Sequence, residues 1–333
     1  MKYRRVGKSG LRISEIALGS WLTYGHNVDK EQTFKCMETA LDHGINFIDS
    51  AEIYAKGKAE QLIGEFLARE TVDRKHLVIS SKVFWPMNED INRWGLGRKN
   101  ILTAIEESLD RLNTDYVDLY YMHRYDYTTP LHETVDVIND LIHEGKIRYW
   151  GTSMWTAAQL ERVNAIAKEN KQYKPIVEQP AYNMFTRHIE LEIMKVAKTH
   201  GMGFTVWSPL AQGLLTGKYN NGIPEGSRAS SSENMKSQIT EEKLAQVRKL
   251  GEIAKSLNIK TSQLALAWIL RRPEISAAII GATRPEQVIE NVEASSIELT
   301  SEILLLIENV LNNSPQWPWG YEPNVYHKDE MRK

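Results

Sequence analysis

Two kinds of apolar pattern alternate along the chain. Short apolar runs predict buried β-strands, and each is followed by a longer segment in which apolar residues recur every three or four positions, as on one face of an amphipathic helix. Asp29 is the predicted N-cap of the first of these helices. The predicted strands lie at 16–20, 47–49, 77–82, 117–122, 147–152, 175–179, 203–207 and 276–280. Helical patterns follow them, including 58–70, 156–169, 188–199, 241–257, 261–271 and 285–293.

Eight strand–helix pairs without a linker or a break in composition predict one fold. They are typical of a (β/α)8 TIM barrel, an α/β fold whose active site lies at the C-terminal ends of the strands. A β-hairpin at 2–13, turning at Gly7-Lys-Ser-Gly10, precedes the barrel. We predict a single domain over residues 1–333, with the barrel at about 14–313, a long polar loop at 209–238 and a tail at 314–333.

Composition excludes several classes of function. The 333 residues carry 41 basic and 43 acidic side chains, a net charge of −2, so no bulk charge favours nucleic acid or an anionic membrane. No apolar run approaches the roughly 18 residues of a membrane span, and the single cysteine, Cys36, fits a reducing compartment and a place in the core. These features predict a cytoplasmic protein, and we find no convincing set of metal ligands.

Four side chains capable of proton chemistry follow consecutive predicted strands. Asp49 ends the second strand and Tyr54 comes five residues later, Lys82 ends the third strand, and His123 follows the fourth. Loops at the C-terminal ends of barrel strands carry catalytic groups, so these neighbours on the ring are expected to meet. An acid, a phenol, an amine and an imidazole together suggest a tuned proton donor.

The loops after strands seven and eight have a different character. Trp207 and Ser208 follow strand seven, and Gly281-Ala-Thr-Arg284 runs directly into the helix at 285–293. A helix N-terminus after strand eight is the usual phosphate site of this architecture. Thr283 and Arg284 there suit a phosphate monoester.

Several motifs together resemble those of one family. Asp-x4-Tyr at 49–54, Ser-Lys at 81–82, Gly-Thr-Ser at 151–153, Glu-Gln at 178–179 and Trp-Ser-Pro-Leu at 207–210 form a very specific set. With them the chain resembles the aldo-keto reductases, and most of all the branch that contains the potassium-channel beta subunits. The likeness extends to about residue 313.

The resemblance implies NADPH-dependent reduction of aldehydes and ketones. Tyr54 would be the general acid, and Lys82 would lower the pKa of its phenol from about 10. Asp49 would hold Lys82 in position. His123 would orient the substrate oxygen. The channel-subunit branch tends to carry asparagine where this chain has His123, so the histidine restores the pattern of the active reductases.

The resemblance also assigns residues to NADPH or NADP+. Trp207 would stack on the nicotinamide, while Ser153 and Gln179 would bond its carboxamide. The remaining expected contacts lie near the pyrophosphate, the 2′-phosphate and the adenine. They are Ser20, Trp21, Ser208, Pro209, Leu210, Ala211, Lys218, Arg228, Gly281, Thr283, Arg284, Gln287, Glu290 and Asn291.

Aromatic residues in the first and third loops predict the wall of a substrate pocket. Trp21, Tyr24 and Trp85 would form this wall, and an aromatic, largely uncharged pocket suits a small carbonyl compound. Trp317 and Trp319 in the tail are too apolar for a free segment and are expected to pack against the barrel or a neighbouring subunit. By analogy with the channel-subunit branch, the chain would form a homotetramer.

Two other functions compete with a reductase. The first is a cofactor-loaded regulatory subunit in which slow chemistry reports the redox state, and His123 argues against it. The second is a barrel lyase with Lys82 as a Schiff-base amine. The cofactor loop argues against that reading.

Overall fold

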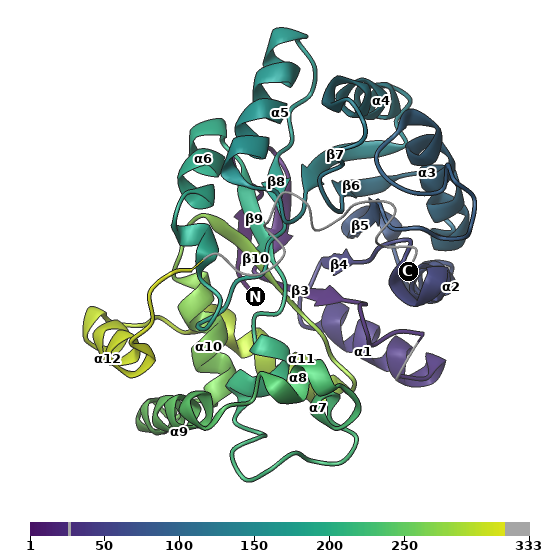
Figure 1. Cartoon of the computed structure of the whole chain (residues 1–333). Coiled ribbons are helices and arrows are strands. Elements are labelled where there is room, and N and C mark those ends of the chain that lie inside the picture. The colour runs from purple at the N-terminus through teal and green to yellow at the C-terminus, as the bar shows by residue number, and fades with distance from the viewer. Residues whose placement is uncertain (26–27, 317–333) are drawn as a thin grey trace.

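Eight parallel strands form a closed barrel with helices around it (Figure 1). The computed structural model describes residues 1–25 and 28–316. Around the barrel the strands follow in the order β10-β3-β4-β5-β6-β7-β8-β9, which confirms the predicted (β/α)8 architecture. The strands are β3 Ile16–Gly19, β4 Phe47–Asp49, β5 Val78–Val83, β6 Val117–Met122, β7 Ile147–Thr152, β8 Val177–Glu178, β9 Gly203–Val206 and β10 Ile275–Ile280.

The helices follow the predicted ranges closely. Asp29 caps the first of them by accepting from the Gln32 N–H, and Thr156 forms a capping box with Gln159. The long helices are α1 Lys30–Asp42, α2 Lys58–Leu67, α3 Arg98–Leu112, α4 Leu131–His143, α5 Ala157–Glu169, α6 Ile193–His200, α9 Glu241–Ser256, α10 Thr261–Leu270, α11 Pro285–Val292 and α12 Ser301–Leu311. Among the described residues, no helix has the length and apolar character needed to cross a membrane.

Three segments differ from the sequence prediction. The strand expected at 175–179 is regular only at Val177 and Glu178, although the N–H groups of Ile176 and Gln179 still donate to the Trp150 and Thr152 carbonyls. The helix expected at 188–199 is split into η3 His188–Glu190 and α6. The loop expected at 209–238 contains η4 Ala211–Thr216, α7 Arg228–Ser231 and α8 Glu233–Ser237, which are anchored by apolar side chains that the polar composition obscured.

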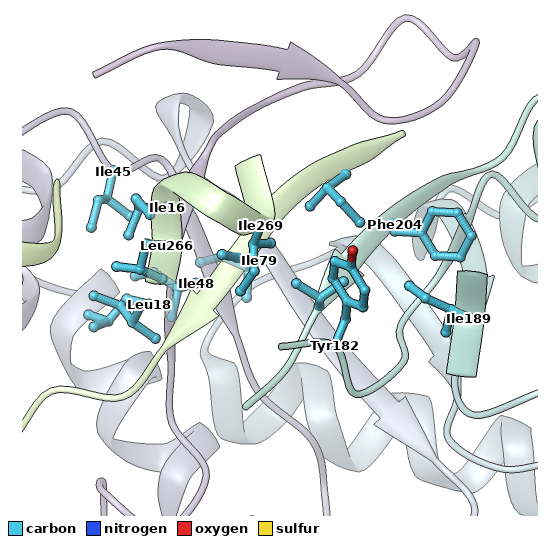
Figure 2. Close-up of a cluster of buried hydrophobic side chains, with 14 of the residues drawn as sticks. Ile16, Leu18, Ile45, Ile48, Ile79, Tyr182, Ile189, Phe204, Leu266 and Ile269 are labelled. Atoms are coloured by element: carbon cyan, nitrogen blue, oxygen red, sulfur yellow. The ribbon is translucent and has the colours of Figure 1, made fainter. Parts of the chain in front are cut away.

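Alternating residues of the strands divide the core into two layers. Ile16 and Leu18 of β3 face outward and pack with residues such as Leu266 of α10, whereas Ala17 between them faces inward. Figure 2 shows part of the outer layer, in which Ile48, Ile79 and Phe204 extend from β4, β5 and β9. Cys36 is fully buried in this layer, as predicted for a core residue.

The N-terminal hairpin packs against the inner layer. Its strands are β1 Tyr3–Arg5 and β2 Arg12–Ser14, and Val6 and Ile13 belong to the inner cluster. Gly7 has a φ of +56°, and a Cβ there would lie 2.2 Å from the Gly201 carbonyl oxygen. This end of the barrel is therefore closed by tight packing, and the C-terminal ends of the strands are left to carry the site.

Candidate active site

A cavity of about 1230 Å³ lies over the C-terminal ends of the strands. Every strand contributes to it through its last residue or the loop that follows, as the barrel architecture predicts. Its lining includes Trp21, Asp49, Tyr54, Trp85, His123, Ser153, Gln179, Trp207 and Arg284. Three of the four residues expected to carry proton chemistry, and most of those expected to hold a cofactor, therefore line one cavity.

Strand register explains how Asp49 and Lys82 meet. Asp49 is paired with Ser80 across the β4–β5 ladder, and Lys82 lies two residues further along on the same face. The Lys82 Nζ donates to Asp49 Oδ2 at 2.7 Å and to the Ser50 carbonyl at 2.6 Å. Ser80 and Gln179 donate to the other carboxylate oxygen, at 2.7 and 2.9 Å. Asp49 is thus held by hydrogen bonds on both oxygens while it holds the ammonium.

Tyr54 lies at the start of a tight turn between β4 and α2. Ala55 and Lys56 have positive φ values of 50° and 52°, which turn the chain into α2 directly after the tyrosine. The Lys82 Nζ lies 4.8 Å from the centre of the Tyr54 ring. The rings of Tyr54 and His123 meet edge to face with centroids 5.9 Å apart. The phenol therefore lies between the buried ammonium and the imidazole.

The pKa of Tyr54 differs from the sequence expectation. Burial raises it well above its usual range, the carboxylate of Asp49 raises it further, and the guanidinium of Arg124 acts in the opposite direction. Burial is therefore the main reason for the difference, because it disfavours the charged tyrosinate. Tyr54 is therefore a protonated phenol at neutral pH.

His123 is buried beside the phenol. Its backbone N–H extends the β5–β6 ladder by donating to the Val83 carbonyl at 3.0 Å, which fixes the main chain at this position. Burial lowers its pKa well below the usual range, and the charges of Arg124 and Lys82 lower it further. The imidazole is therefore neutral. Its Nδ1 has no hydrogen-bond partner within residues 1–25 and 28–316.

Lys82 is inaccessible from the cavity. Its side chain is 0% exposed, and it does not belong to the lining. A Schiff-base amine must reach a carbonyl carbon, so this burial and the two short hydrogen bonds of Nζ argue against the lyase hypothesis.

Most of the residues expected to contact the nicotinamide, the pyrophosphate and the other phosphates of a cofactor line the cavity. Ser153, Gln179, Trp207, Ser208, Pro209, Leu210, Lys218 and Arg228 line the cavity. Ser153 Oγ donates to the Gln179 carbonyl at 2.8 Å, which ties the loops after β7 and β8 together. Ser20 and Ala211 do not line it. Ser20 is fully buried and donates to the Asp49 carbonyl, and Ala211 packs against the outer core layer.

The residues expected at the adenosine end of a cofactor lie at the start of α11 and in the loop before it. Gly281, Thr283, Arg284, Gln287, Glu290 and Asn291 all line the cavity here. Gln287 Oε1 accepts from the Thr283 N–H at 2.8 Å, which orders the loop before the helix. Glu290 accepts from Lys260 and from Ser262, each at 2.6 Å. Ser262 also lines the cavity, and no feature of the α10 sequence had distinguished it.

The substrate wall differs from the prediction at two positions. Trp21 and Trp85 line the cavity as expected. Tyr24 does not: it is fully buried in the outer core layer, because the chain turns back after β3 with its N–H bonded to the Ser20 carbonyl. The prediction of Tyr24 as a wall residue is therefore corrected. Arg124 also lines the cavity, so the wall near Tyr54 carries a charge that the sequence analysis overlooked.

Glu52 is a second residue that the sequence analysis overlooked. It lies between Asp49 and Tyr54 in the sequence and is only 1% exposed, and the backbone of Phe84 forms a hydrogen bond with its carboxylate. Arg93 lies 3.6 Å away but donates to Asn100 and Glu107 instead. Burial therefore outweighs the attraction of Arg93 and raises the pKa of Glu52 to about 8.

Two further expectations concern metals and the tail. Within residues 1–25 and 28–316, no group of three or more His, Cys, Asp or Glu side chains is arranged to hold a metal ion. The packing expected of Trp317 and Trp319 lies outside the described residues.

Comparison with known proteins agrees with the fold. Residues 15–312 match the model of the aldo/keto reductase family. A protein of Arabidopsis thaliana and one of Oryza sativa subsp. japonica, each named "Probable voltage-gated potassium channel subunit beta", are 42% and 41% identical over 329 residues. Each alignment covers 96% of this chain and 100% of the relative.

A third relative comes from Schizosaccharomyces pombe (strain 972 / ATCC 24843). This relative is named "Putative voltage-gated potassium channel subunit beta" and is 43% identical over 323 residues. The alignment covers 94% of each of the two chains. The chain belongs to the aldo/keto reductase family, and an oxidoreductase role fits this membership.

Proposed function

We propose that the protein is an NADPH-dependent reductase of aldehydes and ketones in which Tyr54 is the general acid. The observation that carries this proposal is the convergence of Asp49, Tyr54 and His123 on one cavity, with the buried Lys82 behind them. The same cavity continues to the start of α11, where Thr283 and Arg284 lie. Proton chemistry and dinucleotide binding would therefore take place in a single site.

The residues present fit a nicotinamide dinucleotide. Three residues of the cavity lining provide the contacts that such a cofactor needs. Trp207 offers an aromatic face, Gln179 a partner for the carboxamide, and Arg284 a positive charge at the start of a helix. Arg284 is two-thirds exposed, and only Glu286, at 4.0 Å, is near enough to form an ion pair among the described residues. A guanidinium at this position suits the 2′-phosphate that distinguishes NADPH from NADH. When bound, the cofactor would supply the hydride.

The proton would come from Tyr54. As hydride reaches the carbonyl carbon, the phenol O–H gives its proton to the carbonyl oxygen, so that an alcohol and a tyrosinate are formed. The raised pKa keeps Tyr54 protonated before reaction. The Lys82 ammonium, 4.8 Å from the ring, would stabilise the tyrosinate as its charge develops. Asp49 would keep that ammonium in place.

His123 would orient the carbonyl. Because its imidazole is neutral, one ring nitrogen is a donor and the other an acceptor. A neutral N–H can hold the carbonyl oxygen beside the phenol without competing with it as an acid. The edge-to-face packing of the two rings fixes their relative positions.

A second candidate function follows from the relatives. Their names describe voltage-gated potassium channel subunits, so this chain is also a candidate for a cofactor-binding regulatory subunit whose slow turnover reports the redox state. The two proposals differ in turnover, because a purely sensory subunit would not cycle repeatedly.

A titration followed by a turnover assay tests the proposal. NADPH should quench the fluorescence of the protein, and the complex should then oxidise many equivalents of NADPH when 4-nitrobenzaldehyde is added. Tight binding without turnover over a range of carbonyl compounds would favour the sensory subunit. An absence of NADPH binding would contradict both functions.

A further inference from the structure

We propose that Glu178 is a positioning residue for the nicotinamide end of the cofactor, because its buried carboxyl group holds the turn that presents Ser153 to the cavity. This role rests on the proposed function, in which Ser153 and Gln179 are the residues expected to bond the carboxamide. Glu178 itself would touch neither the cofactor nor the substrate. Its loss should therefore weaken binding at one end of the dinucleotide only.

Glu178 lies behind the cavity wall. It belongs to β8 and is paired with Thr152 of the neighbouring strand β7. The next residue, Gln179, lines the cavity, whereas the side chain of Glu178 points to the other face of the strand and is 0% exposed. Glu178 can therefore act on a ligand only through the residues that its carboxyl group bonds.

The carboxyl group accepts three hydrogen bonds from the end of β7 and the loop after it. Thr152 Oγ1 donates to Glu178 Oε2 at 2.5 Å, and the Trp155 N–H donates to Oε1 at 3.1 Å. The backbone of Met154 forms the third bond. Residues on both sides of Ser153 are thus attached to one buried group, which comes from the adjacent strand.

These bonds hold a backbone conformation that is uncommon for the residue present. Met154 has a φ of +62°, in the left-handed region that residues with a Cβ seldom occupy. The N–H groups of Met154 and Trp155 belong to the two peptide units that flank the Met154 Cα. A carboxyl group that accepts from both fixes the orientation of these two units. Because such a conformation persists only where its surroundings hold it, we assign this task to Glu178.

The turn determines where Ser153 lies. The Ser153 N–H donates to the Met122 carbonyl at 3.0 Å, and its hydroxyl donates to the Gln179 carbonyl at 2.8 Å. The Gln179 N–H donates to the Thr152 carbonyl at 2.8 Å, so the loops after β7 and β8 form one unit. Without the carboxyl group of Glu178, the chain after Ser153 would relax and this unit would lose its shape.

Two ligands distinguish the ends of the site. NADPH would occupy the whole cavity, whereas adenosine 2′,5′-bisphosphate has no nicotinamide and would report only on the adenosine end. The Kd of each ligand is measured by isothermal titration calorimetry, and the ratio of the NADPH value to the bisphosphate value is compared between variants. A substitution that only loosens the fold would raise both constants and leave their ratio unchanged.

Two conservative substitutions separate the reach of the side chain from its chemical group. Glu178→Asp keeps the carboxyl group but withdraws it by one methylene, and Glu178→Gln keeps the length and one acceptor oxygen. We expect the ratio to rise about 10-fold in Glu178→Asp, the scale of buried N–H groups that lose their acceptor, and less than about 3-fold in Glu178→Gln.

Glu15→Asp provides the matched control. Glu15 precedes β3 at the opposite end of the barrel, is 4% exposed and is paired with Arg4. Shortening this second buried glutamate disturbs the fold in a comparable way but is remote from the cavity. The ratio of the two Kd values should therefore equal that of the wild type.

An unchanged ratio in Glu178→Asp would overturn the inference. An increase in Glu178→Gln as large as that in Glu178→Asp would also overturn it, because reach would then not be the property that matters. If Glu178→Asp does not fold, Thr152→Val removes one of the three bonds and keeps the shape of the side chain. It should raise the ratio about 3-fold, and an unchanged ratio there would overturn the inference as well.

The two proposals fail in different ways. If the wild type does not bind NADPH, the proposed function fails and the role of Glu178 fails with it. If the wild type binds NADPH but the ratio does not respond to Glu178, only the positioning role is wrong.

Discussion

Replacing Asp49 with asparagine should destabilise the protein in a way that depends on pH. The Asp49–Lys82 pair has a 2.7 Å separation and both side chains are almost completely buried. At an effective dielectric constant of about 20, two charges this close attract by roughly 6 kcal/mol, which offsets the cost of burying them. In Asp49→Asn the ammonium would remain buried without its counter-charge, and losing one partner of a buried pair costs about 3–5 kcal/mol.

Deprotonation of Lys82 sets an upper limit on this loss. Burial already lowers the pKa of Lys82 and Asp49 raises it, so removing the carboxylate lowers the pKa further. A lysine that is neutral in the folded state must lose its proton on folding. Because its pKa in the unfolded chain is about 10.4, this deprotonation costs about 4.6 kcal/mol at pH 7 and about 1.9 kcal/mol at pH 9. A group with a lowered folded pKa binds more protons when unfolded, so the stability of the variant should rise with pH in this window.

Urea denaturation followed by circular dichroism tests this reasoning. We expect Asp49→Asn to lose about 3–5 kcal/mol of unfolding free energy at pH 7 and clearly less at pH 9. The double variant Asp49→Asn/Lys82→Met has no buried charge at this position and should be more stable than Asp49→Asn alone. A loss below about 1 kcal/mol at pH 7, or a loss that does not shrink at high pH, would refute the assignment of Asp49 as the counter-charge.

Three further predictions follow from the charges of the site. Because the folded pKa of Glu52 is raised to about 8, its ionisation increasingly opposes folding as the pH rises from about 4.5 to 8. The unfolding free energy of Glu52→Gln, relative to that of the wild type, should therefore be higher at pH 8.5 than at pH 5 by at least about 1 kcal/mol. The same difference between variant and wild type at the two pH values would contradict this prediction. Because the pKa of His123 is lowered and that of Tyr54 raised, kcat/KM for reduction should stay flat between about pH 6.5 and 8. A titration of activity in this range that disappears in a His123 variant would count against the neutral imidazole. Arg284→Ala should raise the Kd for NADPH much more than that for NADH, and equal increases would show that Arg284 does not read the 2′-phosphate.

The sequence was a good guide wherever a residue is defined by its place along a strand. Asp49 and Lys82 could be expected to meet because neighbouring parallel strands end at the same edge of the barrel. The alternation of Ile16, Ala17 and Leu18 between the two core layers follows from the period of two along a strand, although the sequence analysis did not predict it. These are consequences of local geometry, and they need no knowledge of how loops fold.

Residues in loops were harder to place. Tyr24 and Trp21 are both aromatic and lie in the same loop, but the turn after β3 buries one and leaves the other at the cavity. The charge of Arg124 was overlooked because nothing in a single sequence tells an arginine at a cavity wall from one in solvent. The aromatic residues around it had suggested a wall without charge.

Electrostatic balance was also beyond the sequence. Lys82 was expected to lower the pKa of Tyr54, but burial raises that pKa, and the carboxylate of Asp49 raises it further. Glu52 similarly follows Asp49 by three residues and resembles any solvated glutamate in the sequence. Its raised pKa depends on its burial, which only the folded structure shows.

The most direct test of the account compares Tyr54→Phe with the wild type. The variant should bind NADPH with nearly the same Kd, because the hydroxyl is assigned to the proton and not to the cofactor. Its steady-state turnover of 4-nitrobenzaldehyde should fall by about 100-fold or more, the usual scale of general acid catalysis. Turnover close to that of the wild type, with normal NADPH binding, would contradict the assignment of Tyr54 as the proton donor.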